Sequence, residues 1–152
     1  MKLFRQAHAQ RRWAEATDLY AAPLLHGLPT VNLPGVQEWL DGERAALHGL
    51  WLTAVSGQEQ ALLEGGKVDE AARRLRRALT LDPLSEETLQ RFVRASVEAG
   101  RREEALHAAE RFTARLQGDL GLTPTPATLT LIEVVQQAGP GGPFAENRAA
   151  ER

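Results

Sequence analysis

Two stretches decide the fold of this 152-residue chain, EGGKVDEAA at Glu64–Ala72 and EAGRREEAL at Glu98–Leu106, and they align without a gap. Their matching glycines, Gly66 and Gly100, lie 34 residues apart, and the alanine five positions after each glycine is matched as well. A fixed period of about 20 to 50 residues is typical of arrays of stacked supersecondary units. The two stretches therefore predict a repeated unit.

A period of 34 residues is that of the tetratricopeptide repeat, a pair of helices whose small residues allow close packing. Ala78 and Pro83 occupy the positions where this repeat has its second small residue and its closing proline. The WAEA stretch at Trp13–Ala16 resembles an earlier, third copy of the same step. We therefore predict an all-α fold of tetratricopeptide-like stacked helical hairpins, with about six helices.

The choice of apolar residues also indicates helices. The sequence holds 24 Ala and 23 Leu against 8 Val and one Ile, and β-branched residues lose side-chain freedom in a helix whereas Ala and Leu lose little. Gly and Pro mark the boundaries, and Ser85 followed by two acids is a candidate N-cap. The spacing of the apolar residues predicts helices over 4–25, 36–64, 68–81, 86–99, 102–117 and 127–138.

Charge and composition exclude several classes of protein. Eighteen basic and 20 acidic side chains give a net charge of −2 and a pI near 6.1, whereas a domain that grips nucleic acid with its own surface has a basic face and a high pI. There is no cysteine, no apolar stretch of membrane-spanning length and no signal peptide at the start. We expect a cytoplasmic protein that does not contact a membrane.

We predict no catalytic, cofactor-binding or metal-binding residues. Neither a phosphate-binding glycine loop nor a nucleophile elbow occurs in the sequence. The four histidines lack the spacing of a zinc site, being isolated at His8, His26, His48 and His107. The sequence thus indicates no enzyme and no cofactor.

A basic cluster lies on the helix expected over 68–81, formed by Arg73, Arg74, Arg76 and Arg77. Direct DNA binding through Arg73, Arg74 and Arg77 is one hypothesis, because guanidinium groups bind phosphate. The alternative is a solvated face, which is the more common meaning of charges opposite an apolar stripe. The acidic pI favours the solvated face.

A stack of helix pairs offers its inner groove to a partner. The repeat register predicts that this groove is lined by residues from the first helices of two consecutive units, namely Thr53, Ser56, Gln60, Leu63, Glu87, Gln90, Arg94 and Val97. The alternative is that these residues are simply solvated or lie between helices.

Three runs of the chain resemble a known family. They are ALTLDPLSE at Ala78–Glu86, AGRREEAL at Ala99–Leu106 and LGLTPTP at Leu120–Pro126. In this order they are similar to the runs Ala-Leu-x-Leu-Asp-Pro-Leu-x-Glu, Ala-Gly-Arg-x-x-Glu-Ala-Leu and Leu-Gly-x-x-Pro-x-Pro of the bacterial transcriptional activator domain of the Streptomyces antibiotic regulatory protein type. Upstream residues fit as well, so the resemblance covers roughly residues 4 to 137.

The resemblance implies a helical, tetratricopeptide-like module that follows a winged-helix DNA-binding domain in transcription activators and supports dimerisation and regulation. We expect this module over residues 1–138, and a Gly/Pro-rich break with a polar tail over residues 139–152. No DNA-reading domain precedes Phe4, so we expect either a segment of a longer regulator or a stand-alone relative.

Two hypotheses of function follow. The first is a non-enzymatic regulatory and dimerisation module of a bacterial transcription regulator, which reaches DNA only indirectly through a separate DNA-binding domain. Its partner is a second copy, or another domain or subunit of the regulator. The alternative is a stand-alone tetratricopeptide adaptor that binds a partner peptide in the groove.

Overall fold

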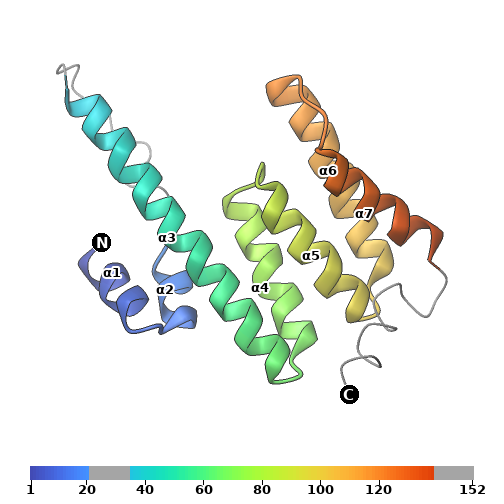
Figure 1. Cartoon of the computed structure of the whole chain (residues 1–152), viewed down its shortest axis with the longest axis horizontal. Coiled ribbons are helices and arrows are strands. Elements are labelled where there is room, and N and C mark those ends of the chain that lie inside the picture. The colour runs from blue at the N-terminus through green and yellow to red at the C-terminus, as the bar shows by residue number, and fades with distance from the viewer. Residues whose placement is uncertain (21–34, 139–152) are drawn as a thin grey trace. The chain divides into compact units, whose positions relative to one another are not determined.

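The computed structural model describes residues 1–20 and 35–138. Within this part of the chain there are seven α-helices and no strand, which confirms the all-α prediction. The helices are α1 (Lys2–Ala9), α2 (Trp13–Leu19), α3 (Val36–Glu64), α4 (Val68–Leu81), α5 (Glu86–Glu98), α6 (Arg102–Leu120) and α7 (Pro126–Gln137) (Figure 1). The predicted tail over 139–152 lies outside the described residues.

The chain forms two compact units, Met1–Ala61 and Leu62–Arg152. Helices α1 and α2 belong to the first unit together with most of α3, and α4 to α7 belong to the second. Each unit is described on its own below.

The predicted helix over residues 4–25 is wrong, because the structure has two short helices, α1 and α2, in its described part. Arg11 adopts a left-handed backbone conformation, with φ of 53°. The Arg12 N–H then donates to the Ala7 carbonyl at 2.9 Å, and the Arg11 N–H donates to the His8 carbonyl at 3.0 Å. This pair of bonds is a Schellman turn, which ends one helix and redirects the chain into the next.

The same turn occurs at both glycines of the 34-residue repeat. Gly66 and Gly100 have φ of 72° and 76°. The N–H of the residue after each glycine donates five residues back, from Lys67 at 2.8 Å and from Arg101 at 2.7 Å. The third copy expected at Trp13–Ala16 fits this register, because Arg11 precedes Trp13 as Gly66 precedes the first residue of α4.

One alanine follows each turn at the same distance. Ala16, Ala71 and Ala105 each stand five residues after the left-handed residue, and the exposed fraction of each is 0%. A buried alanine lets a helix approach its neighbour closely. The repeat seen in the sequence is therefore a repeat of the turn and of the packing contact that follows it.

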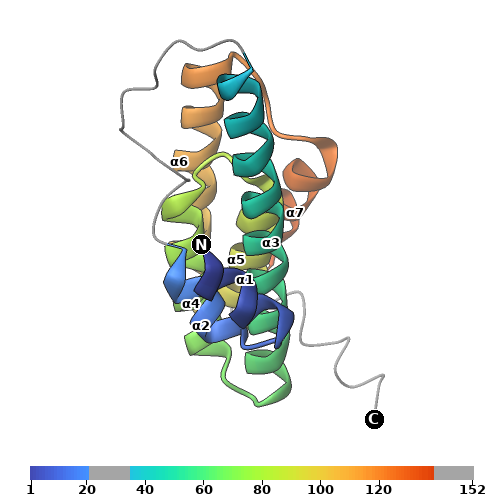
Figure 2. The same cartoon turned by 90° about the vertical axis from the view of Figure 1, so that its left-hand side faces the viewer.

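The first unit is held together by aromatic rings. Helices α1 and α2 lie against α3 (Figure 2). The Tyr20 ring stacks on Trp51 with ring centroids 5.0 Å apart and meets Phe4 at 5.8 Å. The buried Thr17 hydroxyl donates to Gln58 of α3 at 2.9 Å, so the polar groups at this contact satisfy each other.

In the second unit, α5 is the central helix and packs against α4, α6 and α7. Leu89, Phe92 and Val93 of α5 are at most 1% exposed. Their spacings of three and four residues put them on one face of the helix, which lies in the core. Ser85 is the N-cap of α5, as predicted, and its hydroxyl accepts from the Thr88 N–H at 3.2 Å. Helix α6 runs to Leu120 and not to the predicted end near Gln117, because Gly118 stays helical and the left-handed turn comes at Gly121.

We predict that Gly100→Ala lowers the free energy of unfolding by about 1 kcal/mol, because left-handed φ is unfavourable for a residue with a Cβ. A Cβ at Gly100 would touch nothing within 4 Å, so the effect is one of backbone conformation alone. The reverse change, Arg11→Gly, should raise the stability of the first unit. All three tryptophans lie in that unit, so their fluorescence follows urea unfolding of Arg11→Gly, and far-UV circular dichroism follows Gly100→Ala. Unchanged midpoints would contradict the prediction.

A second prediction concerns Gly57, where an added Cβ would lie 2.6 Å from the Trp13 ring. Gly57→Ala should therefore push α2 away from α3 and destabilise the first unit by about 1 to 3 kcal/mol. Gly49→Ala is the matched control on the same helix. A Cβ there meets no atom within 4 Å, and better helix propensity should raise stability by up to about 1 kcal/mol. If Gly57→Ala and Gly49→Ala changed the free energy of unfolding equally, as followed by tryptophan fluorescence, Trp13 would not require a glycine at position 57.

Candidate protein-interaction site

Helix α7 is anchored at its N-terminus by a carboxylate from α5. Glu86 accepts from the Thr125 N–H at 3.0 Å, from the Thr125 hydroxyl at 2.7 Å and from the Thr128 hydroxyl at 2.6 Å. Gln90, one turn further along α5, donates to the Thr128 hydroxyl at 2.8 Å. Glu86 therefore caps a helix that begins 40 residues later in the sequence.

The environment of Glu86 favours its charged form. Burial alone would raise the pKa of this carboxyl group, but the hydrogen bonds from Thr128 and Thr125 outweigh burial, so its pKa is lowered. The positive end of the α7 dipole lies at the same place. The ionised carboxylate is thus part of the folded second unit.

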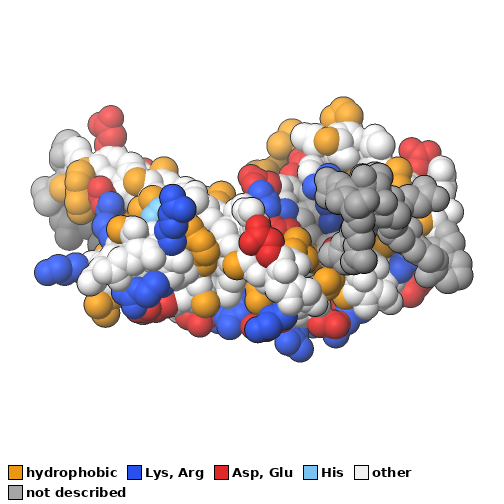
Figure 3. Space-filling model, turned by 60° about the horizontal axis from the view of Figure 1, so that its bottom comes forward, with side chains coloured by type: hydrophobic (Ala, Val, Ile, Leu, Met, Phe, Trp, Pro, Cys, Tyr) orange, Lys and Arg blue, Asp and Glu red, His pale blue; other side chains and the backbone are white. Residues whose placement is uncertain are grey.

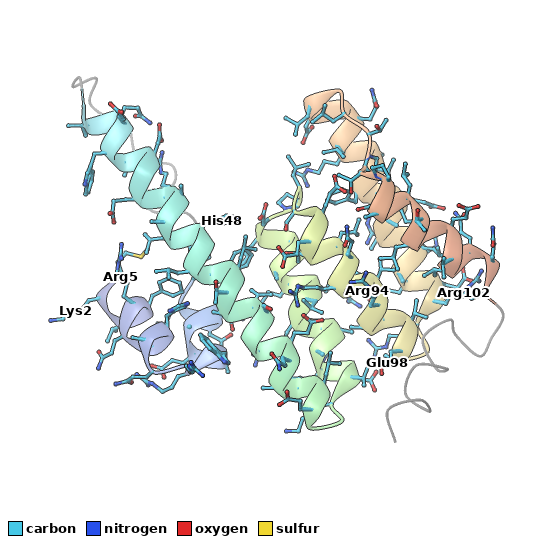
Figure 4. All side chains as sticks on the ribbon, in the orientation of Figure 1. Lys2, Arg5, His48, Arg94, Glu98 and Arg102 are labelled. Atoms are coloured by element: carbon cyan, nitrogen blue, oxygen red, sulfur yellow. The ribbon has the colours of Figure 1, made fainter. Side chains whose placement is uncertain are left out.

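The C-terminus of α7 is anchored by a charge of the opposite sign. Arg102, the first residue of α6, donates through Nε to the Val135 carbonyl at 2.9 Å and through a terminal nitrogen to the Gln136 carbonyl at 2.6 Å. In Figure 4 the Arg102 side chain lies beside this end of α7. A cation at the last carbonyls of a helix is stabilised by the dipole. Helix α7 is therefore clamped by an anion at its N-terminus and a cation at its C-terminus, each opposite in sign to the end of the helix dipole that it contacts.

The predicted groove residues of α5 lie in different surroundings. Glu87 is exposed and bonds to Arg91 at 3.0 Å, whereas Gln90 belongs to the network under α7. Arg94 is exposed and has no polar partner in the part of the chain that the structure describes. Val97 is only 7% exposed.

The predicted groove residues of α3 are more accessible. Thr53 and Gln60 are exposed, and Ser56 and Leu63 are half-buried. The Thr53 hydroxyl donates to the Gly49 carbonyl of its own helix. Because three of these residues belong to the first unit and Leu63 and α5 to the second, the groove stays a prediction.

The basic cluster of α4 forms an ion pair with an acid of α6. Arg76 pairs with Glu104 of α6, and both Arg74 and Arg77 have polar or ionic interactions. Arg73 is exposed. On the face drawn in Figure 3, basic and acidic side chains are intermixed and form no basic surface.

Large apolar side chains are exposed around the junction of α6 and α7. Leu120 and Leu122 are each 55% exposed, and Leu129 of α7 is 47% exposed. In the first unit Trp39 is 62% exposed, with Val36 one turn before it at 43%. Large exposed apolar side chains are candidates for contact with a partner. We call Leu120, Leu122 and Leu129 the α6–α7 corner.

Neither a metal site nor a membrane-spanning helix is found in the described ranges 1–20 and 35–138. No group of three or more His, Asp or Glu side chains there could hold a metal ion. None of the helices described is both long and apolar enough to cross a membrane.

Comparison with known proteins identifies the family. Residues 3–136 match the bacterial transcriptional activator domain. The chain belongs to this family. A domain of this kind is a module of transcription regulators, which confirms the resemblance seen in the three sequence runs.

A solved structure agrees on the fold. The chain is similar to EmbR of Mycobacterium tuberculosis, whose structure is in complex with a low-affinity phosphopeptide, with a TM-score of 0.62 and 22% sequence identity. The similarity covers 96% of this chain and 38% of EmbR, so the chain spans well under half the length of that protein. It supports a tetratricopeptide-like helical domain. No curated protein matches the chain.

All three family runs take part in the turns and contacts of the second unit. Glu86 of the first run bonds to Thr125 of the third, and Gly100 of the second run forms the left-handed turn. Arg101 of the second run pairs with Asp69 of α4 at 3.0 Å. The residues that define the family here therefore maintain the fold.

The sequence analysis did not identify the clamp on α7. Pro126 at the first position of α7, after Thr125, is a local signal for a helix N-terminus. Its partner Glu86 lies 39 residues earlier and was interpreted only as an acid in the first turn of α5. No spacing rule connects the two.

We predict that Glu86→Gln lowers the free energy of unfolding by about 2 kcal/mol at neutral pH, because charge-assisted hydrogen bonds to Thr125 and Thr128 are lost. The pKa of Glu86 is lowered in the folded state, so its stabilisation is present above the unfolded pKa of about 4.3 and is lost as pH falls through the folded value. The difference between wild type and variant should therefore shrink on acidification to about pH 3.

The matched control is Glu87→Gln, the neighbouring acid, which is exposed and bonds only to Arg91 among the contacts described. Its effect should stay within about 0.5 kcal/mol. Urea unfolding followed by circular dichroism between pH 7 and about pH 3 measures both. A Glu86 variant that behaved like the Glu87 variant would contradict the clamp.

Proposed function

We propose that this chain is a regulatory module of a bacterial transcription regulator that works in the cytoplasm through protein contacts, self-association among them, and performs no catalysis. The observation that carries the proposal is the match to the bacterial transcriptional activator domain over residues 3–136. The exposed leucines of the α6–α7 corner support a protein-binding role.

DNA is reached indirectly in this proposal, through a separate DNA-binding domain. The net charge is −2, and Arg76 of the basic cluster is paired with Glu104. Phosphate binding by a protein surface depends on cations that can replace the counterions of DNA. This domain offers few such cations on a single face.

The second candidate is an adaptor that binds a peptide in the predicted groove. Arg94 favours it, because this exposed guanidinium has no polar partner among the described residues. A peptide is also what the EmbR structure contains, as a low-affinity phosphopeptide. The burial of Val97 and the inward bond of Gln90 reduce the groove surface that α5 can offer.

We predict that the chain dimerises, as measured by sedimentation velocity over a range of concentrations. Leu122→Asp should raise the dimer dissociation constant about tenfold or more, because it replaces an apolar side chain that is 55% exposed with a charged one. The neighbouring change Thr123→Asp is the matched control, because Thr123 is exposed and polar, and it should leave the dimer intact.

A strict monomer at every concentration would reject self-association, and a dimer unaffected by Leu122→Asp would exclude the α6–α7 corner as its interface.

The same preparations can be tested for DNA binding. We expect no retardation of DNA by this chain in low salt, and a retarded complex with a steep salt dependence would instead support the arginine hypothesis.

A further inference from the structure

A pocket of about 520 Å³ lies on the second unit, lined by residues of α4, α5, α6 and the α4–α5 turn. Helices α4 and α6 both pack on α5. Glu104, Arg111 and Arg115 line it from α6 at spacings of seven and four residues, so they share one face of that helix. None of the clamp residues Glu86, Arg102, Thr125 or Thr128 lines this pocket.

The charged lining is predominantly basic. Three guanidiniums, from Arg76, Arg111 and Arg115, line the pocket with a single carboxylate, Glu104. Glu104 is engaged by Arg76, and it also lies 3.9 Å from Arg101. The lining itself therefore carries more positive than negative charge, while Arg115 is also bonded to Asp119 outside the lining.

Arg111 and Arg115 are the cations available to a ligand. Arg111 is exposed and has no polar or ionic partner in the described part of the chain. Arg115 bonds to Asp119 at 3.3 Å through Nε. The two arginines are four residues apart on one helix face, where both can reach one acid group.

The pocket also has an apolar floor. Leu79 of α4 and Pro83 of the α4–α5 turn line it and are half-buried, so they offer apolar surface. Phe92 and Phe112 also line it, but they are only 1% and 3% exposed and belong to the core. Apolar side chains beside a few charged groups are typical of sites for small organic ligands, and the pocket volume lies in the range of such sites.

We propose that this pocket binds a small organic anion with an aromatic or aliphatic body, its acid group at Arg111 and Arg115 and its apolar body against Leu79 and Pro83. Such a ligand combines a carboxylate or phosphate, which guanidinium recognises by paired hydrogen bonds, with a group that these apolar side chains shield from water. Binding of this ligand would let a small molecule, in addition to protein partners, regulate the proposed regulatory module.

The test uses the full chain and four probes in titrations followed by amide NMR shifts. Phenyl phosphate and 3-phenylpropionate carry both an anion and a ring, inorganic phosphate carries only the anion, and benzyl alcohol carries only the ring. We expect the first two to bind about tenfold or more tightly than the last two, with shifts confined to α4, α5 and α6. A tighter phenyl phosphate than phenylpropionate indicates a phosphate ligand, and the reverse indicates a carboxylate.

Arg111→Ala should weaken the tighter probe about tenfold, and Arg111→Lys should lose part of that affinity because it keeps the charge without the planar fork. Lys67→Ala is the matched control, since Lys67 is also an exposed cation without a described side-chain partner but does not line the pocket. Its affinity should equal that of wild type. Arg115→Gln provides a second variant, and circular dichroism checks that each variant is folded.

The proposal is overturned if neither ring-bearing anion binds saturably, if Arg111→Ala binds as tightly as wild type, or if the shifts map outside these helices. An acidic peptide that binds here while the small anions do not would also overturn it, in favour of a peptide site. These outcomes are independent of dimerisation, which sedimentation measures separately.

Discussion

Three turns of this protein obey one constraint, in which a left-handed residue is followed five positions later by an alanine that no solvent reaches. The pairs are Arg11 with Ala16, Gly66 with Ala71, and Gly100 with Ala105. The turn satisfies the last carbonyls of one helix. The alanine then allows the next helix to pack closely, because a longer side chain at that point would separate the helix axes. The spacing between turn and alanine is what the sequence repeat preserves.

The second unit depends in addition on the clamp around α7. A helix of 12 residues is marginal in isolation, so its stability comes from its contacts. Thr128, Leu131 and Val135 bury one side of it, while Glu86 and Arg102 supply the charges that its two ends require. The clamp therefore couples the starts of α5 and α6 to the last helix, and loss of either charge leaves polar groups of a helix end without their partner.

This arrangement separates the residues that build the fold from those that can meet a partner. Glu86, Gly100 and Arg101 carry the family runs and are engaged inside the second unit. The groups left for function are exposed: the leucines of the α6–α7 corner and Arg111 above the pocket. The proposed regulatory role needs this combination, in which a firmly held helical scaffold presents apolar and charged groups to other molecules.

The helices over 36–64 and 68–81 were predicted to the residue, because glycine, proline and apolar spacing act over a few neighbours along the chain. The turn at Arg11 was missed because arginine rarely adopts left-handed φ. The groove over Thr53 to Val97 stays a prediction, since it rests on repeat register alone. The bond of Glu86 to Thr125 and the gathering of Arg76, Arg111 and Phe92 around one pocket follow no local rule. They join residues far apart in sequence, and folding alone determines which of many acids and arginines come to lie within reach.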